Sequence, residues 1–192
     1  MTGTDQQLEG FLQALVEELV IPESRYEQAE RSYKSLGDWF HRHESRIRDF
    51  DPVVYVQGSF RLGTAIRPIN DAEEYDIDSV CELKNLTKND LTQSDLKHLL
   101  GREVQAYHDA KGMTKPVREG RRCWILSYAD GAQFHMDILP ALPNGMEQRL
   151  LLERAQFDPQ WTDWAIAITD RDVSTYQERT SDWRRSNPKG YG

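Results

Sequence analysis

Apolar residues recur at intervals of three and four in three long segments, which is the period of an amphipathic α-helix. These segments predict helices over residues 5–20, 23–48 and 92–110. Pro22 separates the first two, and Thr92 with Asp95 forms a helix-capping pattern at the start of the third. Shorter helical patterns occupy 60–66 and 146–155. The chain is therefore expected to begin with two long helices and to carry a third in its middle.

Short apolar or alternating runs between these helices have the length and residue types of β-strands. They cover residues 53–56, 74–83, 122–128, 133–139 and 164–168. A turn at 129–131 is expected to join the third and fourth runs into a hairpin, and Pro140 is expected to end the fourth strand. Strands and helices in this order indicate an α+β fold, in which helices flank a mixed or antiparallel sheet and further helices precede it.

Length and composition are those of one globular domain. The chain has 192 residues, 38% of them hydrophobic, and includes five Trp. Its net charge of −8, from 32 acidic and 24 basic residues, argues against a broad grip on an extended nucleic acid. With two cysteines, no signal-like start and no apolar run of membrane-spanning length, we expect a cytoplasmic protein without membrane contact.

Acidic residues mark two of the predicted strands. Asp76 and Asp78 project from one face of the second strand, because alternate residues of a strand share a face. Asp137 shares the polar face of the fourth strand with His135, and the residues between and beside them are apolar. Three carboxylates on neighbouring strands can hold divalent metal against a nucleoside triphosphate. This arrangement predicts nucleotidyl transfer.

Each of the three carboxylates has an expected role. Nucleotidyl transfer builds negative charge on phosphate oxygens, which divalent cations neutralise. We assign Asp76 and Asp78 to both ions of a two-metal site and Asp137 to the ion that activates the attacking hydroxyl, with Asp137 also accepting its proton. The expected cofactor is therefore a pair of divalent cations. The competing interpretation is three solvated carboxylates, which the ordered set of motifs disfavours.

A glycine turn precedes the acidic strand. In Gln57-Gly58-Ser59, the glycine lets the backbone approach a phosphate, and the serine offers its hydroxyl and amide. Arg61 and Thr64 lie within reach of the same phosphates, although a solvated surface role fits Arg61 equally well. A later basic run fits either a solvated loop or a nucleotide or primer contact, and its members are Lys115, Arg118, Arg121 and Arg122.

Taken in order, these motifs resemble the cyclic GMP-AMP synthase/DncV-like nucleotidyltransferases (CD-NTases) of bacterial CBASS anti-phage systems. The resemblance spans about residues 50 to 192 and rests on Gln57-Gly58-Ser59, Gly63-Thr64, Pro68, Asp76-Ile77-Asp78, Arg122-Cys123, Phe134 to Ala141, Trp183 and Ser186 to Tyr191. It implies a polymerase-β-like fold, two Mg²⁺ ions with Mn²⁺ as the alternative, ribonucleoside triphosphates such as ATP, and a cyclic di- or trinucleotide product. By position, it implies that Gly58 and Ser59 hold the triphosphate and that the three aspartates ligate metal.

The resemblance also divides the chain. Residues 1–50 are expected to be N-terminal helices that pack on the core, and residues 51–192 the catalytic core. In that family a helical C-terminal domain begins where this chain stops, so we expect the chain to be an N-terminal catalytic part. Turnover by these residues alone is expected to be weak, because a closed site excludes water and positions both substrates. Regulatory or effector proteins of the same defence system are the expected partners.

Two other functions are compatible with the motifs. The same glycine-serine turn and carboxylates serve nucleotidyltransferases that modify RNA, a protein or a small molecule, and the acceptor site decides among them. The second alternative is a catalytically inactive nucleotidyltransferase-like binding module. The intact carboxylates and glycine-serine turn argue against that alternative.

Overall fold

The computed structural model describes residues 3–68, 70, 74–128, 134–160 and 162–190. Their helices and strands follow one another along the chain as α1 (Gly3–Leu19), α2 (Glu23–Phe40), η1 (Arg48–Phe50), β1 (Pro52–Val56), α3 (Gly58–Leu62), β2 (Tyr75–Leu83), α4 (Gln93–Ala110), β3 (Arg118–Glu119), β4 (Trp124–Tyr128), β5 (Phe134–Pro143), α5 (Gly145–Arg154), η2 (Thr162–Trp164), β6 (Ile166–Ile168) and β7 (Arg184–Ser186). The predicted hairpin turn at 129–131 lies outside the described residues.

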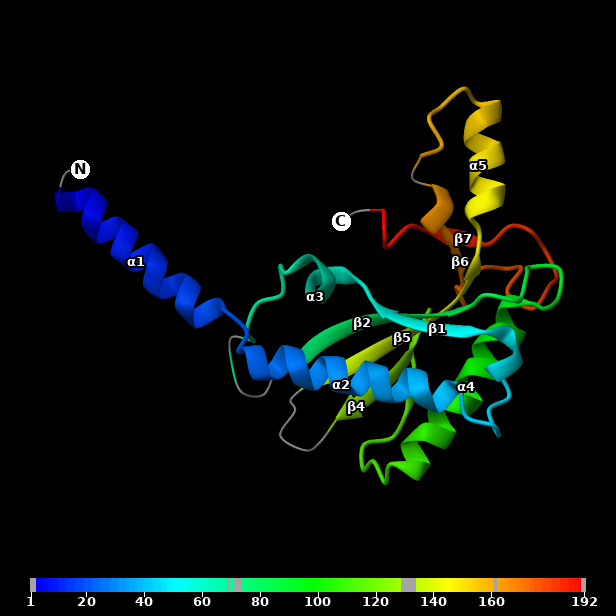
Figure 1. The fold of residues 1–192 in the computed structure, drawn as a ribbon, viewed down its shortest axis with the longest axis horizontal. Coiled ribbons are helices and arrows are strands. Elements are labelled where there is room, and N and C mark those ends of the chain that lie inside the picture. The colour runs from blue at the N-terminus through cyan, green and yellow to red at the C-terminus, as the bar shows by residue number, and fades with distance from the viewer. Residues whose placement is uncertain (1–2, 69, 71–73, 129–133, 161, 191–192) are drawn as a thin grey trace.

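The described strands form one seven-stranded sheet (Figure 1). The order is β1-β2-β5-β4-β3, and β6 extends it by pairing with the end of β5 and with β7. Strands β2 and β5 run parallel, whereas the other pairs of described strands are antiparallel. The prediction of an α+β fold with a mixed sheet flanked by helices is confirmed.

One face of the sheet is covered by α2 and α4. Leu36 and Phe40 of α2 and Leu96 and Leu100 of α4 are buried in the same apolar cluster as Ile77 and its neighbours on the sheet. Burial along the first part of β2 and of β5 alternates with every second residue, as it does in a strand that has one covered face. The residues between these core positions therefore face away from α2 and α4.

Helix α1 lies apart from this core. Figure 1 shows it projecting beyond the start of α2, and the apolar side chains that predicted it are exposed, namely those of Leu8, Phe11, Leu12, Leu15 and Val16. The helix itself follows the predicted period. The structure thus differs from the expectation that both N-terminal helices pack on the core, because α2 contacts β1 and α4 whereas α1 leaves its apolar face uncovered.

The end of α2 differs from the prediction. The helix stops at Phe40 instead of continuing to Arg48, and turns follow. In these turns the Arg42 guanidinium lies 3.9 Å from the centre of the Trp39 ring and pairs with Glu103 of α4 at 2.7 Å. Contacts with a distant helix therefore contribute to this boundary, since neither glycine nor proline follows Phe40 before Pro52 and Gly37 lies inside the last turn of the helix. The capping box predicted at Thr92 is confirmed.

Strand β5 is longer than predicted. Pro140 does not end it, because the fixed φ of proline fits an extended backbone and the strand continues by pairing Ala141 and Leu142 with β6. The short strands β3 and β7 were not predicted at all, since both consist largely of exposed charged residues. β3 adds an edge strand beside β4, and β7 extends the sheet beyond β6.

Two expectations from composition can be compared with the structure. Cys81 and Cys123 are free thiols, the first buried in the core and the second half-buried. Burial raises the pKa of the Cys81 thiol, with a further contribution from the charge of Glu82, so this thiol is unreactive. Within the described ranges, no helix is both long enough and apolar enough to cross a membrane.

Candidate active site

The register of β2 and β5 determines where the acidic residues meet. In this parallel pair Asp76 lies beside His135, and Asp78 lies beside Asp137. All four side chains occupy the face of the sheet opposite α2 and α4, because each alternates with a buried core residue. The structure therefore brings the predicted carboxylates of two strands together on one face.

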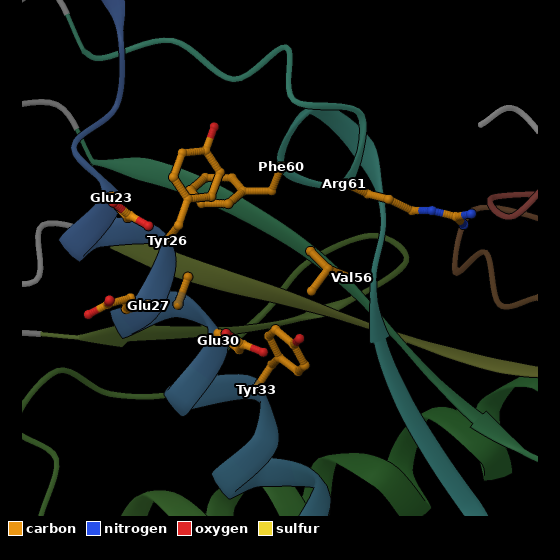
Figure 2. Close-up of a pocket in the computed structure, with 9 residues that line it drawn as sticks. Glu23, Tyr26, Glu27, Glu30, Tyr33, Val56, Phe60 and Arg61 are labelled. Carbon is orange, nitrogen blue, oxygen red and sulfur yellow. The ribbon is translucent and has the colours of Figure 1, made fainter.

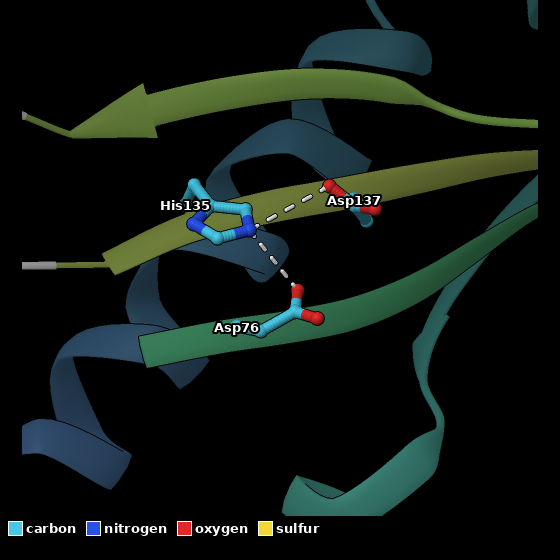
Figure 3. A group of neighbouring side chains, drawn as sticks. All are labelled: Asp76, His135 and Asp137. Atoms are coloured by element: carbon cyan, nitrogen blue, oxygen red, sulfur yellow. Dashed lines mark ion pairs between the residues drawn. The ribbon is translucent and has the colours of Figure 1, made fainter. Parts of the chain in front are cut away.

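Asp76, His135 and Asp137 form the tightest group on this face (Figure 3). One possible ligand atom from each lies within 4.8 Å of the other two. The Nε2 atom of His135 is 3.4 Å from Oδ1 of Asp76 and 4.0 Å from Oδ1 of Asp137. A histidine thus stands among the carboxylates that the sequence singled out.

The two carboxylate oxygens of Asp137 have different surroundings. The Cys123 thiol donates a hydrogen bond to Oδ2 over 3.1 Å. Oδ1 is buried and has no hydrogen-bond partner among the described residues. Leaving a carboxylate oxygen in that state is unfavourable, whereas carboxylates and imidazoles are common ligands of divalent cations. The residues present therefore fit a divalent metal ion.

Asp78 lies beside this group, with its carboxylate against the glycine turn. Burial, followed by repulsion from Asp76 and Asp137, raises the pKa of Asp78 to about 6. Burial and the charge of Asp137 also raise the pKa of Asp76. Both pKa shifts arise first from burial and then from neighbouring negative charge, and a bound cation would counter both effects.

Two hollows flank the carboxylates. Ser59 and Thr64 line the first, of about 340 Å³, together with Asp76. Gln57 lines the second, of about 270 Å³, next to Asp78. The glycine turn reaches this position because β1 pairs with β2, and the Gln57 amide donates to the Asp78 carbonyl over 2.8 Å. These residues lie at the edges of the acidic face, and their role in nucleotide binding stays a prediction.

The Arg61 side chain is directed to the C-terminal segment instead of the acidic site. Its guanidinium donates a hydrogen bond over 2.8 Å to the carbonyl of Pro188, in the C-terminal segment. Figure 2 shows its side chain extending away from a hollow of about 530 Å³ between α2 and α3. Glu23, Glu27 and Glu30 line the helix side of that hollow, which would repel a triphosphate. The hollow is therefore a poor candidate for the nucleotide site despite its size.

Side chains of the basic run are held by acidic residues of the fold. Arg121 and Arg122 contact Asp170 at 2.7 and 3.1 Å, and Lys115 pairs with Glu74. Arg122 also lines the second hollow, together with Asp78 and Asp137. Structural ion pairs account for these three cations without a nucleotide or primer.

Glu74 and Cys123 contact the site but received no role from the sequence. Glu74 lies two residues before Asp76, so the alternation that selected the two aspartates would have selected it as well. Oε2 of Glu74 is 3.4 Å from Nδ1 of His135. Cys123 precedes β4, and no pattern in the sequence shows that its thiol reaches Asp137.

We expect Gly58→Ala to destabilise the protein and displace Asp78. Gly58 has a φ of 65°, which disfavours residues with a side chain, and a Cβ there would overlap Oδ2 of Asp78. The expected loss is about 2–3 kcal/mol of unfolding free energy in urea. Gly63→Ala is the matched control, because Gly63 has a φ of 66° and a Cβ added there would have no atom within 4 Å. Equal losses in the two variants would contradict the steric argument.

Part of this chain is similar to a known family of nucleotidyltransferases. Residues 52–140 match the family described as "Cyclic GMP-AMP synthase DncV-like, nucleotidyltransferase domain". A c-di-GMP synthase from Roseivirga ehrenbergii is 24% identical over 185 residues, which cover 96% of this chain and 42% of that protein. The chain therefore spans less than half of the curated relative that it matches.

Solved structures share the fold at low identity. The CD-NTase CdnG of Bradyrhizobium diazoefficiens, in complex with GTP, superposes with a TM-score of 0.64 at 20% identity, over 91% of this chain and 42% of that one. The GTP-bound form of Vibrio cholerae DncV gives 0.56 at 14% identity, over 91% and 55%. The polymerase-β-like architecture is thereby confirmed. Residues 52–140, slightly less than half of this chain, are thus similar to the DncV-like nucleotidyltransferase domain.

Proposed function

We propose that this chain is the catalytic part of a metal-dependent nucleotidyltransferase that joins ribonucleoside triphosphates into a cyclic di- or trinucleotide. The observation that carries the proposal is the convergence of Asp76, Asp78 and Asp137 on one sheet face beside the Gly58 turn, in a chain that is partly similar to the DncV-like family. The R. ehrenbergii relative is a c-di-GMP synthase and the Bradyrhizobium CdnG structure contains GTP, which supports nucleotide substrates here.

The cellular part of the proposal is a role in anti-phage signalling in the cytoplasm. It rests on the family, whose CBASS systems use cyclic nucleotides as signals. An E. coli relative of the same fold, CdnC, with a TM-score of 0.55 and 18% identity, was solved as a complex with a HORMA protein. A regulatory protein partner of this kind therefore belongs to the proposal, as does a helical C-terminal domain following the core at 51–192.

Mg²⁺ is the proposed ion, and Asp76, Asp78 and Asp137 are the residues that would hold it. The unpaired Oδ1 of Asp137 and the raised pKa values of the other two carboxyls support this assignment. When bound, the metal would neutralise the charge that develops on the phosphate oxygens.

Residues of the protein are proposed to orient the triphosphate and to accept the proton of the attacking hydroxyl. Gly58 leaves room for the Asp78 carboxylate to lie against the turn, and Ser59 borders the same hollow as Asp76, where its hydroxyl would orient the triphosphate. Cys123 holds one oxygen of Asp137 and leaves the other directed into the site. The Asp137 carboxylate is also the proposed acceptor for the proton of the attacking hydroxyl.

Labelled ribonucleoside triphosphates test the reaction directly. The protein, both as this chain and in a longer form that contains it, is incubated with Mg²⁺ and labelled ATP, GTP, CTP and UTP and then treated with phosphatase. A cyclic product has no terminal phosphate, so we expect a phosphatase-resistant species whose mass gives the bases and the ring size. Label that instead appears on tRNA or on protein would favour a nucleotidyltransferase with another acceptor.

Calorimetry separates an enzyme from an inactive binding module. We expect this chain to bind a non-hydrolysable triphosphate in a Mg²⁺-dependent manner, and the double variant Asp76→Ala/Asp78→Ala to bind it at least about tenfold more weakly because the metal ligands are gone. Asp109→Asn, at an exposed acid on α4, is the matched control and should bind as the unmodified chain does. Unchanged triphosphate binding in the double variant would favour the module.

A further inference from the structure

The geometry points to His135 as a nitrogen ligand of the metal at the acidic face, which gives the site a preference for Mn²⁺ over Mg²⁺. This inference rests on the proposed function, since it concerns the same site. The proposed site differs from an all-carboxylate site because one donor atom is an imidazole nitrogen instead of a carboxylate oxygen. A donor of that kind changes which ions the site selects.

The position of His135 is set by backbone pairing. The parallel register places it beside Asp76, and Asp137 follows two residues later on the same face of β5. Nε2 lies 3.4 Å from the Asp76 Oδ1 and 4.0 Å from the Asp137 Oδ1 (Figure 3). Donor atoms that share one ion at bond lengths of about 2.1 Å lie about 3 to 4 Å apart. Two of the three distances fall in this range and all three atoms lie within 4.8 Å of one another, so the side chains can close around one cation.

The other ring nitrogen of His135 has the partner that a metal ligand requires. Nδ1 lies 3.4 Å from Oε2 of Glu74, and Glu74 is itself paired with Lys115. Metal-binding histidines generally direct their second nitrogen to a carboxylate, which fixes the tautomer and the orientation of the ring. The carboxylate of Glu74 favours the hydrogen on Nδ1, and this leaves the lone pair of Nε2 directed at the two aspartates.

Asp137 and Asp78 support the same donor set independently. The Cys123 thiol occupies Oδ2 of Asp137, so the buried and unpaired Oδ1 is the oxygen on the side of His135. The Asp78 carboxylate is turned toward Gly58, lies outside the group whose ligand atoms are within 4.8 Å of one another, and is left for a second ion of the site. The most compact donor set of the described face therefore consists of two carboxylates and one imidazole.

Pulsed electron paramagnetic resonance of bound Mn²⁺ tests this assignment without requiring turnover. We expect the echo of Mn²⁺ bound to this chain to be modulated by imidazole nitrogen, and the modulation to change when the chain is labelled with ¹⁵N-histidine. The modulation should be lost in His135→Gln. His98→Asn is the matched control, since His98 is an exposed histidine on α4 outside the site, and it should retain the signal.

Competition between the two ions supplies a second measurement. We expect His135→Gln to lower Mn²⁺ affinity about tenfold or more and Mg²⁺ affinity much less, so that the preference for Mn²⁺ falls. Glu74→Ala removes the carboxylate behind the ring and should weaken Mn²⁺ binding about tenfold while His135 is still present. Circular dichroism of each variant verifies that the fold is retained.

The outcomes separate this inference from the proposed function. Bound Mn²⁺ without nitrogen modulation, or an unchanged preference in His135→Gln, overturns the histidine ligand and reduces His135 to an ion-pair partner of the acids. Metal-dependent triphosphate binding and product formation would survive that result. A chain that binds no Mn²⁺ at millimolar concentration would contradict both the histidine ligand and the metal site of the proposed function.

Discussion

Asp137→Asn should reduce nucleotidyl transfer at least about 1000-fold while leaving the fold intact. The substitution keeps the shape of the side chain but removes the negative charge and the basic oxygen at the point where Oδ1 is buried and unpaired. A 1000-fold lower rate corresponds to the loss of about 4 kcal/mol of charge stabilisation in the transition state. The measurement is the initial rate of phosphatase-resistant product, in a form of the protein that contains this chain and is active.

The structural effect of the same substitution should be small. The Cys123 thiol can donate to an amide oxygen in place of Oδ2, and removing one charge lowers the repulsion around Asp78 and Asp76. We therefore expect the unfolding temperature to stay the same or rise. Asp109→Asn, far along α4 and exposed, is the control for a lost carboxylate and should retain full activity. Full activity in Asp137→Asn itself would remove Asp137 from the mechanism.

Asp170→Asn should lower the free energy of unfolding by about 3 kcal/mol. The Asp170 side chain is fully buried and forms ion pairs with Arg121, Arg122 and Arg184. The first two arginines lie in the segment before β4, and the third lies in β7. Removing one partner of a buried ion pair costs about 3–5 kcal/mol of unfolding free energy. We expect the smaller value because the three arginines are partly exposed, so water can still solvate their charges. Urea unfolding at neutral pH measures the loss.

This stabilisation should depend on pH in a defined direction. Burial alone would raise the pKa of Asp170, but hydrogen bonds from Arg121, from the amide of Asp172 and from Arg122 outweigh burial and hold the pKa well below its usual range. A carboxyl with a lowered pKa stabilises the fold fully above the pKa of the unfolded chain, about 4, and loses this effect as the pH falls. The difference between the native protein and Asp170→Asn should therefore shrink below pH 4.

Asp172→Asn is the control for the Asp170 experiment. Asp172 is exposed and contacts Arg121 at 3.1 Å, so its loss should cost less than about 1 kcal/mol. A similar loss in both variants, or a difference between native protein and Asp170→Asn that stays constant down to pH 2, would contradict the assignment of Asp170 as the buried centre of this ion-pair cluster.

Much of the fold was predictable because its elements bury a regular pattern of side chains. The apolar period of α4 and its Thr92 cap define that helix, and the apolar runs of β1, β2, β4 and β5 define the central strands. Where contacts distant in sequence decide the structure, prediction was wrong or silent. The end of α2 depends on Glu103, and the pairing of Arg184–Ser186 with β6 depends on Asp170 and Ile166.

The sequence predicted which residues of the site share a face of each strand, but not which of them are neighbours across the sheet. Alternation placed Asp76 with Asp78 and His135 with Asp137, but the sequence carries no information on which residue of β2 stands beside which residue of β5. The register decides that His135 meets Asp76 and that Asp78 turns toward Gly58. For the same reason the contacts of Glu74 and Cys123 could be found only from the structure.

The parallel pairing of β2 and β5 separates two kinds of evolutionary change. Its backbone ladder fixes the spacing of the acidic cluster, and a slip of one residue would turn every member of one strand into the apolar interior at once. The walls of the flanking hollows come largely from the turn at 57–65 and from the segments around Arg122 and Ser186. Substitutions in those walls can alter which bases or acceptors the proposed reaction uses while its acidic cluster is inherited unchanged.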